Sequence, residues 1–247
     1  MIAVSVVDFI SCMSVARNIA DIRERLARAA ARAGRNPGSI TLMAVSKTVE
    51  PERIREAYAA GLSVFGENRV QEFAGKAAPL AGMSEARWHL IGHLQSNKAR
   101  KAAELFSSVD SVDSLRLAEK LNEAARQSGK TLAVLIEIKT GGEESKSGLP
   151  PASPELEELL RAAPQLEHLQ IRGLMTVPPF TEDPEGARPY FQLLRGLRDR
   201  IAARGLPRVE MDELSMGMSH DFEVAIAEGS TCVRVGTAIF GARPQPA

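Results

Sequence analysis

The sequence predicts a single α/β barrel of eight parallel strands with helices between them. The chain has 247 residues, about the length that one such barrel requires. After Pro37 and Gly38, short apolar runs alternate with helical segments, a pattern typical of a parallel sheet with crossover helices. No low-complexity linker or block of charge divides the chain. We therefore expect one domain over residues 15–247.

The strands and helices of this barrel can be assigned from hydrophobic periodicity. The expected strands are 41–46, 62–65, 87–91, 107–110, 132–138, 169–175, 211–214 and 231–235. The expected helices between them are 51–60, 69–78, 97–105, 114–127, 154–163, 184–203 and 220–227. Strands that each adjoin a helix favour a closed barrel, and an open flavodoxin-like sheet is the alternative.

The first residues differ from this pattern. The apolar stretch from Met1 to Met13 contains Asp8, has no basic leading region and is too short to span a membrane. We expect residues 1–14 to be an extension, with Met13 as a candidate for the true start of translation. The Arg-rich segment that follows has the composition of a mitochondrial presequence. Its apolar residues recur at helical spacing, however, which favours an amphipathic helix ending near Gly34.

The composition limits the function. Lys plus Arg equals Asp plus Glu, at 31 each, so no long-range field attracts nucleic acid or an anionic membrane. Hydrophobic residues make up 44% and charged residues 25%, which is ordinary for a globular protein. Cys12 and Cys232 lie far apart and form neither a disulfide framework nor a metal pair. We expect a cytoplasmic protein.

Reactive side chains of a barrel gather where its strands end. Lys47 follows the apolar run 42–45, so its amine is expected at the barrel mouth. A partly desolvated lysine can have a depressed pKa and attack an aldehyde as the free amine. A solvated lysine at a strand end is the simpler alternative.

The last two strand ends carry groups that suit a phosphate. The segment Ser215–Ser219 offers two hydroxyls and a flexible glycine, while Gly236 and Thr237 offer backbone N–H groups and a third hydroxyl. Phosphate sites in these barrels are frequently built from the loops after strands seven and eight. The alternative is a pair of ordinary turns, with Ser219 capping a helix that starts at His220.

Arg234 lies on an apolar strand, two residues before Gly236 and therefore on the same face. An inward arginine needs an acceptor. A structural salt bridge to Glu137 or Asp212 is one explanation. A ligand is the other.

Two further patterns are weaker. His89 and His93 have the spacing of a zinc pair, but Gly92 lies between them and no third ligand is evident, so we expect polar lining groups and no metal. The segment 141–148 has the composition of a phosphate loop without the P-loop spacing.

With these residues assembled, the chain closely resembles the PLP (pyridoxal 5'-phosphate) homeostasis protein family, also called the YggS or proline-synthetase co-transcribed family. The resemblance covers nearly everything from Met13 to Arg243. The matching strings are AVSKT, FGENRVQEF, WHLIGHLQSNKARK, GEESKSG, IRGLMTV, LSMGMSHDFEVAI and VRVGTAIFG.

The resemblance implies a TIM-type barrel similar to the amino-terminal domain of alanine racemase, with PLP held as a Schiff base on Lys47. Arg234 would face the pyridine nitrogen, and Asn68 would be a neighbour of the ring. Lys146 would be a second lysine at the mouth, assisting cofactor entry or transfer. The residues implied around the phosphate are Ser215, Met216, Ser219, Gly236 and Thr237. One departure is Lys139, where many relatives have Asn, so a second amine could react with PLP.

The resemblance also implies a carrier and regulator of PLP in intracellular vitamin B6 and amino-acid balance, with no established enzyme activity. Its partners would be PLP and apo PLP-dependent enzymes, and we expect a monomer. Because the chain ends at Ala247, soon after the last strand, we expect no carboxyl-terminal β domain of the kind a racemase uses. The alternatives are a PLP-dependent racemase, decarboxylase or lyase with Lys47 as anchor and base, and a phosphosugar aldolase.

Overall fold

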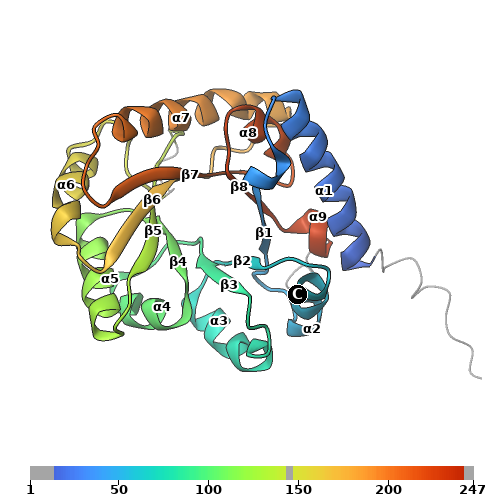
Figure 1. The fold of residues 1–247 in the computed structure, drawn as a ribbon, viewed down its shortest axis with the longest axis horizontal. Helices are drawn as coiled ribbons and strands as arrows, with labels where there is room; N and C mark the ends of the chain where they lie inside the picture. The colour runs from blue at the N-terminus through green and yellow to red at the C-terminus, as the bar shows by residue number, and fades with distance from the viewer. Residues whose placement is uncertain (1–13, 143–146, 242–247) are drawn as a thin grey trace, which may run out of the picture.

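The chain closes into the expected barrel. The computed structural model describes residues 14–142 and 147–241. Its strands form a closed ring in the order β1-β2-β3-β4-β5-β6-β7-β8, with parallel neighbours throughout. Figure 1 shows the ring with the helices outside it. The predicted fold is thus confirmed against the open sheet, while the expected extension and the start at Met13 lie outside the described residues.

The element bounds follow the apolar runs of the sequence. The strands are β1 (Thr41–Val45), β2 (Val64–Glu67), β3 (Arg87–Leu90), β4 (Ser108–Val112), β5 (Leu132–Glu137), β6 (Leu169–Met175), β7 (Val209–Met218) and β8 (Cys232–Val235). The α-helices are α1 (Val15–Arg32), α2 (Pro51–Ala59), α3 (Val70–Ala77), α4 (Ala99–Leu105), α5 (Leu115–Gln127), α6 (Pro154–Ala162), α7 (Arg188–Ala202), α8 (Phe222–Ala227) and α9 (Thr237–Phe240). Short 3₁₀ turns are η2 (Pro37–Ser39), η3 (Ala78–Leu80), η4 (Ser96–Lys98), η5 (Ala163–Gln165) and η6 (Pro184–Ala187). In the described part of the chain, no helix is long and apolar enough to cross a membrane.

The largest difference from the predicted elements is in β7. The sequence predicts a strand at 211–214 followed by a loop, whereas β7 continues to Met218 because Ser215 pairs with β6 and Met218 pairs with β8. Helix α8 accordingly starts at Phe222, with Asp221 at its N-cap position. The alternative interpretation, in which Ser219 caps a helix that starts at His220, is therefore wrong, as is the predicted helix start at residue 220.

Helix α1 shows how the outer layer is held. Ser14 caps it by accepting a hydrogen bond from the Arg17 N–H, and its apolar residues at helical spacing are buried. The helix lies beside α8 and α9 on the outside of the ring (Figure 1). The Asn18 side chain donates to the Ile239 carbonyl at 2.8 Å, which ties the start of the chain to the last helix. This contact supports the closure of the barrel.

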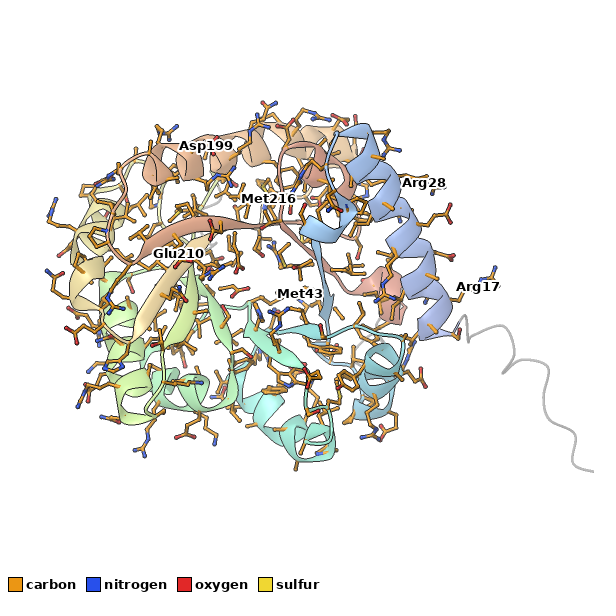
Figure 2. The ribbon with its side chains drawn as sticks, viewed as in Figure 1. Arg17, Arg28, Met43, Asp199, Glu210 and Met216 are labelled. Atoms are coloured by element: carbon orange, nitrogen blue, oxygen red, sulfur yellow. The ribbon has the colours of Figure 1, made fainter. Side chains whose placement is uncertain are left out.

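The barrel interior is only partly apolar. A small cluster of Met43, Val64 and Cys232, with partly buried Ile91, is separate from the main core between strands and helices. Figure 2 shows Met43 within the ring of strands. Arg234 is also buried in the interior, at 3% exposure. A barrel lined by a charged group in this way has an interior suited to polar ligands at its mouth.

We predict that Gly173→Ala destabilises the barrel. A Cβ at this position of β6 would lie 1.9 Å from the Glu213 carbonyl oxygen of β7, so the strands must separate. Overpacking of this kind costs about 1–3 kcal/mol of unfolding free energy, measurable by urea denaturation. Gly75→Ala is the matched control, because a Cβ there meets nothing within 4 Å and replaces a glycine inside α3. The control should be no less stable than wild type, because alanine favours a helix interior more than glycine does. The prediction fails if Gly173→Ala unfolds at the wild-type urea concentration.

Candidate functional site

A cavity of about 340 Å³ lies at the carboxyl ends of the barrel strands. This volume is in the range of small-molecule sites. The expected site residues that line it are Lys47, Asn68, Ser219, Arg234, Gly236 and Thr237. They come from the ends of β1, β2, β7 and β8, so the closed barrel brings together residues that are far apart in the sequence.

Lys47 occupies the first turn after β1 and is half-buried. The preceding Ser46 is fully buried, and its N–H donates to the Gly66 carbonyl at 2.9 Å. The following Thr48 has a φ of 60°, in the left-handed region that a β-branched residue rarely adopts. Contacts from neighbouring elements must therefore hold the backbone around Lys47 in place.

Arg234 is held by two uncharged acceptors. Its Nη1 donates to Ser215 Oγ at 2.8 Å, and its Nη2 donates to the Thr176 carbonyl at 2.7 Å. Among the described residues no carboxylate forms an ion pair with it, so the salt bridges considered to Glu137 and Asp212 are absent there. Burial lowers the pKa of the guanidinium from its usual value. An acceptor in the cavity can therefore interact with a buried, oriented cation.

Ser215 and Met216 do not line the cavity, which differs from the expectation. Successive side chains of a strand point to opposite faces. Ser215 is fully buried against Arg234, and Met216 is fully buried in the main apolar core. Gly217 then has a φ of 93°, and a Cβ there would lie 2.5 Å from Ala225 Cβ, so only glycine fits at this point near the end of β7.

The loop around Ser219 is fixed on both sides. Asp221 Oδ1 accepts the Met218 N–H at 2.6 Å, and burial raises the pKa of this carboxyl. His220 Nε2 lies 3.1 Å from the Thr181 carbonyl and 3.0 Å from the carbonyl of the next residue. A neutral or charged ring can donate from Nε2, so the histidine links this loop to the segment after β6.

The sequence interpretation missed several lining residues. They are Val45, Ile91, Val177, Met218 and His220. Ile91 and Val177 each lie just beyond a strand end, so the rule that located Lys47 could also have located them. Met218 is the last residue of β7 and His220 follows Ser219, and only the tertiary structure shows that both line the cavity.

A second cavity of about 300 Å³ adjoins the first, and the two share Ile91 and Val177. Its lining includes His93, Glu137 and Lys139, the position at which this chain differs from the many relatives that have Asn. Burial raises the pKa of the Glu137 carboxyl, although Ser147 Oγ donates to both carboxylate oxygens at 3.1 Å. Lys146, the expected second lysine of the mouth, lies outside the described residues.

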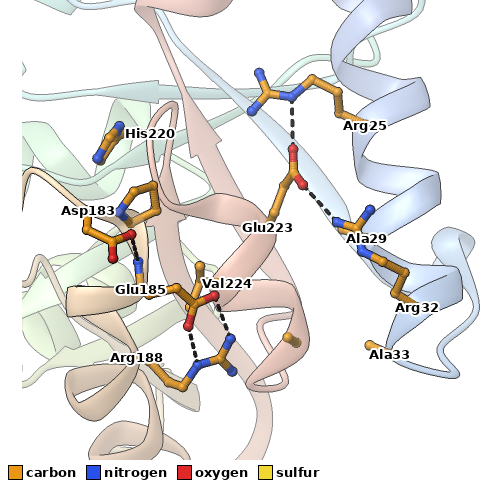
Figure 3. Close-up of a pocket in the computed structure, with 12 residues that line it drawn as sticks. Arg25, Ala29, Arg32, Ala33, Asp183, Glu185, Arg188, His220, Glu223 and Val224 are labelled. Atoms are coloured by element: carbon orange, nitrogen blue, oxygen red, sulfur yellow. Dashed lines mark hydrogen bonds and ion pairs between the residues drawn. The ribbon is translucent and has the colours of Figure 1, made fainter.

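A larger cavity of about 480 Å³ lies outside the ring, between α1 and α8 (Figure 3). Its arginines are already paired with carboxylates of the same cavity. Glu223 accepts from Arg25 at 3.0 Å and from Arg32 at 2.8 Å, while Arg188 pairs with Glu185 at 2.7 Å. Because these charges are satisfied locally, size alone does not make this cavity the functional site.

His89 in β3 and His93, which lies beyond the end of that strand, each pair with an aspartate. His89 Nδ1 lies 3.0 Å from Asp110 Oδ2, and His93 Nδ1 lies 3.1 Å from Asp113 Oδ2. No group of three or more His, Cys, Asp or Glu in the described ranges could hold a metal ion. Burial lowers the pKa of His89, but the charge and hydrogen bond of Asp110 outweigh it, so the net pKa is raised.

We predict that the stabilisation from His89 is lost as pH rises. A raised folded pKa means that this contribution is fully present below the unfolded pKa of about 6.5 and disappears above the folded value. The difference in unfolding free energy between wild type and His89→Gln should thus shrink from pH 6 to pH 9 in urea titrations. The same difference measured in an Asp110→Asn background should lose most of its pH dependence. A constant difference in the wild-type background would contradict the assignment.

Comparisons with known proteins agree with this geometry. The family model for the alanine racemase N-terminal domain matches residues 17–244. The chain is 44% identical over 231 residues to the pyridoxal phosphate homeostasis protein of Aquifex aeolicus, covering 94% of this chain and 99% of that one. It is 45% identical to the protein of the same name from Pseudomonas aeruginosa, covering 93% and 96%.

Solved structures show the same similarity. PipY of Synechococcus elongatus, solved with PLP bound, has a TM-score of 0.81 at 40% identity, covering 92% of this chain and all of that one. Alanine racemase of Clostridium difficile has a TM-score of 0.69 at 17% identity, over 91% of this chain and 60% of that one. The second likeness is one of fold.

Proposed function

We propose that this chain, which belongs to the pyridoxal phosphate homeostasis protein family, binds PLP at its barrel mouth and serves in intracellular PLP homeostasis. One observation carries the proposal: a lysine, a buried arginine and a set of hydroxyl and backbone donors line one cavity. PLP presents an aldehyde, a ring nitrogen and a phosphate. These donors match the chemistry of all three groups.

Lys47 is the anchor in this proposal and carries PLP as a Schiff base. When bound, PLP supplies an aldehyde that condenses with primary amines and a ring that can accept electrons. Arg234 would face the ring nitrogen. A guanidinium has only N–H donors, so it can donate to that nitrogen but cannot accept a proton from it. The nitrogen then stays unprotonated, which weakens electron withdrawal and favours holding the cofactor over turnover.

The remaining residues take supporting roles. Ser219, Gly236 and Thr237 would hold the phosphate through hydroxyl and backbone N–H donors. Asn68 would contact the ring edge, and its position is fixed by close approach to the next strand end, where a Cβ on Gly92 would lie 2.4 Å from the Asn68 carbonyl. Ser215 would act on the cofactor indirectly, by orienting Arg234.

The proposal includes the cellular role. The protein would act as a cytoplasmic monomer that exchanges PLP with apo PLP-dependent enzymes. The even balance of 31 basic and 31 acidic residues supports a partner other than nucleic acid or an anionic membrane. Lys146 would assist entry or transfer of PLP at the mouth.

A PLP-dependent enzyme acting on amino acids is the second candidate. The adjoining cavity favours it, because about 300 Å³ beside the proposed cofactor site gives room for a second small molecule. Glu137 and His93 offer titratable groups there. Such an enzyme would turn over free amino acids, whereas a carrier would release PLP to other proteins.

We predict an absorbance band from bound PLP in wild type that borohydride abolishes. Lys47→Ala should lack this band, because Lys47 supplies the primary amine of the cavity among the residues that the structure describes. The measurement is a visible spectrum of the purified protein with added PLP, before and after reduction. Lys139→Ala is the matched control, since Lys139 is also at the mouth and should leave the band unchanged. If wild type shows no band even with excess PLP, the cofactor assignment is wrong, and the phosphosugar aldolase interpretation is the one to test.

A second prediction separates the two candidate functions. Transfer of PLP from the loaded protein should restore the activity of an apo PLP-dependent enzyme, and free amino acids should not be consumed or racemised above the rate with PLP alone. Chiral chromatography of alanine and a coupled assay of the acceptor enzyme measure both. Turnover that depends on Glu137 and His93 would favour the enzyme instead.

A further inference from the structure

Three charged side chains lie directly behind the turn that carries Lys47. Glu67 at the end of β2 is fully buried, while Lys76 and Glu72 of α3 have side-chain exposures of 12% and 28%. Lys76 Nζ lies 3.0 Å from Glu67 Oε1 and 2.9 Å from Glu72 Oε1. We call these three residues the anchor network.

The anchor network holds the residues on both sides of Lys47. Ser46 Oγ donates to Glu67 Oε1 at 2.7 Å, and the Ser46 carbonyl accepts from Lys76 Nζ at 3.0 Å. On the other side, the Thr48 N–H donates to Glu72 Oε1 at 2.6 Å. An ammonium has three N–H groups, and here they meet two carboxylates and one carbonyl. The network thus supplies the contacts that the left-handed φ of Thr48 requires.

We propose that the anchor network positions the Lys47 amine, with Glu67, Lys76 and Glu72 acting as positioning residues. This inference rests on the proposed function only for its consequence, PLP uptake. The network constrains the backbone at one residue before and one residue after the lysine. The backbone between these points has little conformational freedom. The contacts at Ser46 and Thr48 therefore fix the direction in which the Lys47 side chain leaves the backbone.

The charges of the network explain which variants can fold. Burial raises the pKa of Glu67, and Lys76 opposes that shift. For Glu72, burial also acts to raise the pKa, but the Thr48 N–H and Lys76 outweigh it and the net pKa is lowered. Removing Lys76 alone would leave a buried carboxylate without its cation, which is costly. A double variant that neutralises both Glu67 and Lys76 avoids this penalty.

The first test uses Glu67→Gln/Lys76→Met and measures the Lys47 amine in the full-length protein without PLP. Trace acetylation from pH 6 to pH 10, quantified by peptide mass spectrometry, gives the reactivity of Lys47 relative to exposed Lys120. We expect the pH profile of this ratio to shift and the rate of PLP uptake to fall about tenfold, because small misplacements of a reacting group have effects of this order or larger.

The second test uses the milder position Glu72. Glu72→Gln keeps an oxygen that can accept the Thr48 N–H, and it should retain wild-type labelling and uptake. Glu72→Leu removes that acceptor and should behave like the double variant. Rescue by the conservative change separates positioning from a general loss of stability, and it remains available if the double variant does not fold.

Glu228→Gln is the matched control. Glu228 is also buried and pairs with Arg188 and with Arg195 at 2.9 Å, but it lies at the far end of α8 from Lys47. This variant should have lower stability and unchanged Lys47 labelling.

Wild-type labelling and uptake in folded Glu72→Leu and in the double variant would overturn the inference. Failure of wild type to take up PLP would overturn the proposed function alone, since the labelling does not depend on the cofactor.

Discussion

The pairing of β1 with β8 is the constraint on which the rest of the molecule depends. Thr41 pairs with Cys232 and Ala44 pairs with Val235, so the first and last strands of the barrel end side by side. Lys47 therefore lies at the same cavity as Gly236, although most of the chain separates them in sequence. Helix α1 covers this closure from outside by packing on α8 and α9 (Figure 1). Loss of the closure would separate the Lys47 amine from Gly236 and Thr237.

The closed ring also creates the problem of charged groups inside it. Burying Arg234 without an ion-pair partner among the described residues is unfavourable, and hydrogen bonds to Ser215 and to the Thr176 carbonyl offset part of the cost. Thr176 Oγ1 in turn donates to the Ile138 carbonyl at 2.7 Å. Strands β5, β6, β7 and β8 are thus linked at the mouth through polar contacts. An oriented buried cation at this position suits a ligand that presents an acceptor.

The fold and part of the candidate site follow from local pattern, whereas the place of Asn68 is implied only by the family resemblance. The strand at 169–175 was predicted with its observed bounds, and Lys47 was located by the apolar run before it. The prediction is wrong at β7, where Ser215 and Gly217 indicate a turn. Pairing with β6 and β8 overrides that local preference, because backbone groups between two strands gain partners by remaining extended.

The sequence by itself determined the barrel, the position of Lys47 at the end of a strand and the inward direction of Arg234, since periodicity and strand ends are encoded within a few residues of each. Only the tertiary structure decided that Ser215 contacts Arg234 while Met216 enters the core. Neighbouring residues point to opposite faces only while the chain remains a strand, and the sequence does not show that β7 continues past Leu214. Tertiary structure also decided that Glu67, Lys76 and Glu72 surround the turn at Lys47. Their contacts with that turn join β1, β2 and α3, and no local pattern specifies which side chains meet across separate elements.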